Sequence, residues 1–207
     1  MNDSPATDLD PQRDPRLRPV FRLARACAYD VGHTHQVTRL ALRLFDQLVA
    51  LHGLGEDDRF HLAAAGLLHD IGWCEGQKGH HKTALRLIMK SAELLWDDRV
   101  RRIVGCVARY HRKTLPKMKH EHFAALDEAN RDRVMKLAAL LRLADGMDRT
   151  HTNIVRALCC TVCDDRVIVQ VDVAGRADAE RTIAQQKSDL FEQVYGRPVD
   201  LQWNTIA

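Results

Sequence analysis

The chain has 207 residues, of which 45% are hydrophobic and 29% charged, and a formal net charge of +3. This length and composition indicate one globular domain with its own core, alone or with a small appendage. There is no strong nucleic-acid signal, which would need a dense basic stripe, and no segment has the apolar length that spans a bilayer.

Residues 1–16 are polar and contain prolines, so we expect a disordered tail there. They lack the apolar segment of a secretory signal. Among the six cysteines, Cys160 and Cys163 have CxxC spacing, but no second CxxC or histidine partner follows them. We therefore favour structural cysteines over a zinc or redox site, and a reducing, cytoplasmic compartment.

Residues 17–152 show helical spacing of apolar side chains almost throughout. The expected helices cover residues 17–30, 33–54, 56–70, 79–95, 97–111 and 128–147. Gly72 is expected to stop the third helix as a C-terminal glycine. Asp97 and Asp98 place negative charge at the start of the fifth, where the helix dipole favours it.

The pattern changes after His151. Residues 157–173 alternate around Asp164 and Asp165, which indicates a hairpin. Residues 177–195 are helical and are followed by Gly196, and residues 198–203 could form a third strand. We predict a mainly α fold, with a helical core over 17–152 and an α+β appendage (hairpin, helix, strand) over 153–207.

His69 and Asp70 close an apolar helical run, residues 60–72. Burying a carboxylate there is costly unless a cation compensates it. His33 precedes Val37 by four residues and so lies on an apolar helix face, whereas His35 lies about 200° away, on the solvated side. Helical geometry therefore favours His33 over His35.

Asp145 follows Leu141 by four residues and points inward. By itself, this carboxylate could be satisfied by Arg142, Arg149 or backbone amides. Considered with His33, His69 and Asp70, it favours a metal site. Imidazole and carboxylate ligands suit Mn, Fe, Co, Ni or Mg.

Three more histidines form a second group of candidates: His80 and His81 at the start of one helix, and His111 at the end of the next. They could complete a second metal site beside the first. A histidine-rich surface around an anionic substrate explains them equally well.

Cationic residues lie near these histidines in the sequence, and could bind phosphate oxygens or be solvated at helix ends. They are Lys82, Arg112, Lys113 and Arg149.

The order His33, His69-Asp70, Asp145 resembles the HD superfamily of metal-dependent phosphohydrolases. The segments HTHQVTRLALRLFDQL, AAGLLHDIG, GHHKTALRLI, VARYHRK and LAALLRLADGMDRTH are similar to the C-terminal HD domain of the exopolyphosphatase/guanosine pentaphosphatase family. Members of that family begin with a large actin-like domain that holds the polyphosphatase site. This chain has no room for that domain, so the resemblance does not imply exopolyphosphatase activity.

The resemblance implies four metal ligands, His33, His69, Asp70 and Asp145, and assigns His80 and His111 to the additional histidines of multi-histidine HD enzymes. We expect one or two divalent ions and a stand-alone phosphohydrolase that uses metal-activated water on a nucleotide or another small phosphate ester. Asp70, His80 and His111 are the catalytic candidates. The alternative is a non-catalytic module that binds a nucleotide or polyphosphate or acts in regulation or dimerisation, and a homodimer is compatible with both.

Overall fold

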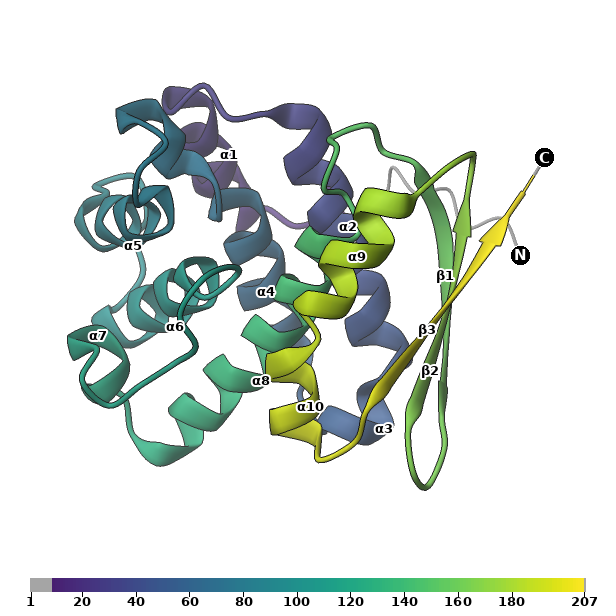
Figure 1. Cartoon of the computed structure of the whole chain (residues 1–207). Helices are drawn as coiled ribbons and strands as arrows, with labels where there is room; N and C mark the ends of the chain where they lie inside the picture. The colour runs from purple at the N-terminus through teal and green to yellow at the C-terminus, as the bar shows by residue number, and fades with distance from the viewer. Residues whose placement is uncertain (1–8, 207) are drawn as a thin grey trace.

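The computed structural model describes residues 9–206, and within them helices dominate (Figure 1). The first eight residues of the expected N-terminal tail lie outside the described part. The helical elements that follow are α1 (Leu17–Ala26), α2 (Val31–Gln47), α3 (Val49–His52), α4 (Glu56–Leu68), the 3₁₀ helix η1 (Ile71–Glu75), α5 (His80–Lys90), α6 (Asp98–Arg109), α7 (Glu121–Ala124) and α8 (Glu128–Gly146).

Three strands and two further helices complete the described chain: β1 (Val155–Val162), β2 (Val167–Val173), α9 (Asp178–Gln186), α10 (Asp189–Tyr195) and β3 (Val199–Thr205). Strands β1 and β2 form the expected antiparallel hairpin. Strand β3 pairs with β2 in parallel, because the chain crosses back through α9 and α10. The mainly α fold with a small hairpin-helix-strand appendage is confirmed.

Several expected boundaries were wrong. The helix expected over 33–54 is interrupted between α2 and α3, and that over 177–195 is interrupted between α9 and α10. The fourth helix ends at Lys90, and Leu95, which we expected inside it, is 92% exposed. The short helix α7 was missed. Periodicity locates apolar faces, but it does not show where the backbone departs from one helix axis.

Gly72 has a different role from the expected one. It lies inside η1, and its φ is not positive. A Cβ atom at this position would come within 2.0 Å of the His80 carbonyl oxygen. A glycine is therefore needed because η1 and the start of α5 are in close backbone contact.

The sheet packs against the helices through α2. The Gln36 side chain donates to the Val155 carbonyl at 2.7 Å, and the Gln47 side chain accepts from the Cys160 amide at 2.8 Å. Buried residues of the sheet and of α10 belong to the same apolar cluster as the buried helix faces. The division of the chain after residue 152 stays a prediction.

Helix α9 lies against the C-terminal part of α8, and Figure 1 shows α9 and α10 in front of it. The contact is close, since a Cβ on Gly146 would lie 2.7 Å from the Cα of Ala184. This crossing brings the end of α9 to the end of α8. None of the described helices is both long and apolar enough to cross a membrane.

Candidate metal centre

Four predicted ligands come together at the ends of three helices. His33 lies in the first turn of α2, His69 and Asp70 follow α4, and Asp145 lies near the end of α8. The His33 Nε2 atom is 3.4 Å from Asp145 Oδ1 and 3.8 Å from Asp70 Oδ2. The His69 Nε2 atom is 3.7 Å from Asp70 Oδ2 and 3.8 Å from Asp145 Oδ1. The structure thus brings all four to one point.

His35, the competitor of His33, lies outside this cluster. Its Nε2 is 2.9 Å from the Tyr29 hydroxyl, and its ring also contacts Phe21. It is half-buried, whereas we expected it on the solvated side. The choice of His33 from the helix face therefore agrees with the geometry, although the surroundings of His35 were misjudged.

Asp148 orients His33. The Asp148 Oδ2 atom is 2.8 Å from His33 Nδ1, and its Oδ1 accepts the Asn153 amide at 2.9 Å. This carboxylate is fully buried. Because it holds the Nδ1 side of the ring, His33 Nε2 faces Asp70 and Asp145. Sequence reasoning missed Asp148; its position three residues after Asp145, about one helical turn, was the available signal.

His69, His80 and His111 share another arrangement. In each, Nδ1 lies 2.7–3.0 Å from the backbone carbonyl three residues earlier, that of Gly66, Gln77 and Ala108 respectively. A carbonyl oxygen only accepts, so Nδ1 must be the protonated donor. The Nε2 lone pair of each ring is then directed away from that bond. This tautomer leaves Nε2 free to bind a metal ion.

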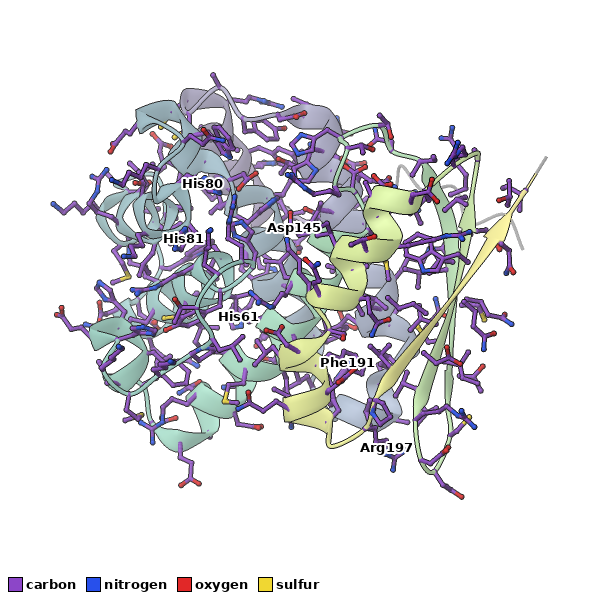
Figure 2. The ribbon with its side chains drawn as sticks, viewed as in Figure 1. His61, His80, His81, Asp145, Phe191 and Arg197 are labelled. Carbon is purple, nitrogen blue, oxygen red and sulfur yellow. The ribbon has the colours of Figure 1, made fainter. Side chains whose placement is uncertain are left out.

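His80 and His111 form a second group with Asp70. Their Nε2 atoms lie 3.2 and 3.4 Å from Asp70 Oδ1. Asp70 thus directs one carboxylate oxygen to each group of histidines. His81, the alternative to His80, belongs to neither group and is only partly buried. Figure 2 labels His80, His81 and Asp145 on the ribbon.

The donor atoms fit a divalent ion. Two ligand atoms that are each about 2.0–2.2 Å from one ion can be no more than about 4.4 Å apart, and the imidazole–carboxylate separations given above are all shorter. His69 Nε2 and Asp70 Oδ1 are buried without any hydrogen-bond partner. Buried polar atoms seldom remain unpaired, so these two are suited to a cation.

The charges at the centre are set by burial and by neighbouring groups. Burial lowers the pKa of His69 and lowers that of His111 to about 3, which keeps both imidazoles neutral. Burial would raise the pKa of Asp70, but its interactions with the surrounding imidazoles of His69, His80 and His111 outweigh burial and lower that pKa. The carboxylate is therefore ionised and the two imidazoles can donate lone pairs.

His33 behaves differently. Burial opposes its charged form, but hydrogen bonds to Asp145 and Asp148 outweigh burial and raise its pKa to about 10. Between these carboxylates a proton or a metal ion can supply the positive charge.

Lys187 is the cationic partner of Asp145, and sequence reasoning missed it. Its Nζ forms an ion pair with Asp145 Oδ2. Burial would raise the pKa of Asp145, yet the charge of Lys187 and the hydrogen bond from His33 hold it well below its usual range. Arg142, one of the partners that we considered, instead pairs with Asp189 at 2.7 Å. No local sequence signal could have indicated Lys187, because its position depends on the crossing of α8 and α9.

A cavity of about 380 Å³ opens beside the centre. Three of the four predicted phosphate-binding residues line this cavity: Arg112, Lys113 and Arg149. Lys82 is not among the described residues that line it, and its side chain is exposed on α5. Helical spacing explains this, since Lys82 follows the buried His80 by two residues and so faces away from it.

Sequence reasoning also missed two aromatic side chains that line this cavity, those of His151 and Trp73. His151 stacks on His33, with ring centroids 3.7 Å apart and planes 3° apart. Its Nδ1 is 3.0 Å from Asp30 Oδ2. Trp73 on η1 stacks on His80 with centroids 4.8 Å apart. Neither residue lies on a periodic helix face, so neither carried a sequence signal.

No curated protein matched the chain. The family model described as Ppx/GppA phosphatase, domain III, matches residues 16–196. This match spans the helices, the hairpin and α9 and α10, and it includes every residue of the centre described above. The chain therefore belongs to the Ppx/GppA phosphatase domain III family.

Proposed function

We propose that this protein is an HD-type metal-dependent phosphohydrolase that acts on a nucleotide or another small phosphate ester. The observation that carries the proposal is the position of Asp70, with one carboxylate oxygen beside His33 and His69 and the other beside His80 and His111. Membership of a phosphatase family supports hydrolysis of a phosphate ester.

The HD assignment is part of the proposal. It rests on the His-Asp pair after α4, a histidine in the first turn of α2 and an aspartate near the end of α8. His33, His69, Asp70 and Asp145 would hold one divalent ion, which could be Mn, Fe, Co, Ni or Mg. Such an ion supplies Lewis acidity, lowers the pKa of water and neutralises phosphoryl charge. His80 and His111, with Asp70, would hold a second.

The cationic residues of the cavity bind the substrate in this proposal. Arg112, Lys113 and Arg149 carry charges that neutralise phosphoryl oxygens, and an arginine can do so through two parallel hydrogen bonds. If only one ion is bound, the Nε2 atoms of His80 and His111, which lie beside Asp70, would be free to hydrogen-bond the phosphate or to act as acid and base.

One observation favours the alternative, a non-catalytic binding module. Two candidate ligand residues are contacted by cationic side chains of the chain itself. Lys187 pairs with Asp145, and Arg112 Nη1 lies 3.1 Å from His80 Nε2. In a module that binds only an anion, these contacts would persist. In the enzyme, a bound ion would displace Arg112 from His80 and leave its guanidinium for the phosphate.

The experiment combines metal analysis with a phosphatase screen. We expect the purified protein to contain a divalent metal and to hydrolyse nucleotides or model esters with added Mn. Asp70→Ala should lose the metal and the hydrolysis together, because it removes a ligand of both groups. Asp165→Ala is the matched control, since Asp165 is exposed in the β1–β2 turn. Wild-type metal content in Asp70→Ala would refute the site, and bound metal without turnover would favour the binding module.

A further inference from the structure

A second cavity, of about 610 Å³, adjoins the one at the candidate metal centre. Asp70, Trp73 and His151 line both cavities, so the two lie side by side around these residues. Cavities of several hundred Å³ are the usual size for small-molecule sites. A ligand with its phosphate at the metal centre could therefore extend past Trp73 into the second cavity.

The two cavities differ in charge. The first is lined by four cationic side chains, those of Arg112, Lys113, Arg149 and Lys187. Among the described residues that line the second, there is no lysine or arginine. The remaining lining residues are Cys27, Ala28, Tyr29, Asp30 and Cys74. A second anionic group would face the carboxylates of Asp30 and Asp70 without a cation, whereas an uncharged ring would contact sulfur, methyl and aromatic groups.

Trp73 presents an exposed indole ring that its neighbours hold in place. It is 45% exposed although it is large and apolar. Its amide donates to the Asp70 carbonyl at 3.1 Å within η1, and its ring stacks on the buried ring of His80. Indole in such a position can stack on a ligand ring without a large loss of side-chain entropy.

We propose that the second cavity, with Trp73 as its wall, binds the base of a nucleoside monophosphate whose phosphate lies at the candidate metal centre. This inference rests on the proposed function for the position of the phosphate. It narrows the substrate class to phosphate esters with an aromatic ring, and it disfavours a polyphosphate chain, whose following phosphates would enter a cavity without cations.

The first test measures specificity with Mn present, as the ratio of kcat/KM for adenosine monophosphate to that for glycerol phosphate, which has no ring. Trp73→Ala should lower this ratio about tenfold, within the range expected for one base–aromatic stack. Trp73→Phe should retain most of it. Trp203→Ala is the matched control, because Trp203 is on β3 and lines neither cavity. An unchanged ratio in Trp73→Ala would overturn the inference.

The second test requires no hydrolysis. Cys74 is exposed and lines the second cavity, whereas Cys159 is exposed on β1 and serves as an internal control. Adenosine monophosphate should slow alkylation of Cys74, measured by mass spectrometry, and should leave Cys159 unaffected. Inorganic phosphate and tripolyphosphate should protect neither. Equal protection of Cys74 by phosphate and by the nucleotide would overturn the inference. Protection without turnover of any ester would refute the proposed function and leave the base site standing.

Discussion

The substitution Asp148→Asn tests how the centre is held together, because it changes the partner of His33 without changing its size. Asp148 accepts two hydrogen bonds, one between Oδ2 and His33 Nδ1 and one from the Asn153 amide to Oδ1. An asparagine has only one side-chain acceptor oxygen. Whichever way its amide is turned, one N–H group therefore faces another donor, or His33 must adopt the other tautomer. That tautomer carries its proton on Nε2, so no lone pair would be available there for a metal ion.

The expected loss of metal affinity follows from the role of Asp148 as the group that orients His33. Removing the group that orients a metal-binding histidine typically weakens metal binding 10–100-fold, which corresponds to about 1.4–2.7 kcal/mol at about 1.4 kcal/mol per factor of ten. Titration calorimetry of the metal-free protein with Mn would measure it. Asp127→Asn is the control, because Asp127 caps the N-terminus of α8, at the opposite end from Asp145, and asparagine caps equally well. A folded Asp148→Asn protein that binds Mn as tightly as the wild type would refute this account of His33.

Two further predictions concern stability. Gly72→Ala should lower the free energy of unfolding, measured in urea, by at least about 1–3 kcal/mol, because its Cβ would meet the His80 carbonyl at 2.0 Å. Gly32→Ala is the control and should be tolerated, since its Cβ meets nothing closer than 3.6 Å. A stable Gly72→Ala protein would contradict the close contact of η1 and α5. Burial lowers the pKa of His52, whose Nδ1 accepts the Leu54 amide at 2.9 Å. His52 therefore takes up a proton more readily in the unfolded chain, so the free energy of unfolding should fall as the pH drops below about 6.5. The fall should be less steep in His52→Asn. Equal pH dependence of the free energy of unfolding in the two proteins would contradict this role of His52.

Most helices and the hairpin could be predicted from the sequence, because the spacing of apolar residues records which face of each element is buried. The same reasoning chose His33 over His35 and placed Asp145 inward. These residues lie on regular helices, where a position in the sequence fixes a direction in space. The cluster of His33, His69, Asp70 and Asp145 was therefore within reach of sequence reasoning.

The partners of that cluster depended on tertiary structure. Lys187 reaches Asp145 because α9 crosses α8 where Gly146 allows close contact. Trp73 lies on a 3₁₀ helix, and His151 has a positive φ of 58° in the loop after α8. Local spacing describes one element at a time. The charge around Asp145 and the walls of the cavities are set by how elements that are distant in the sequence pack together, and only the folded chain determines that packing.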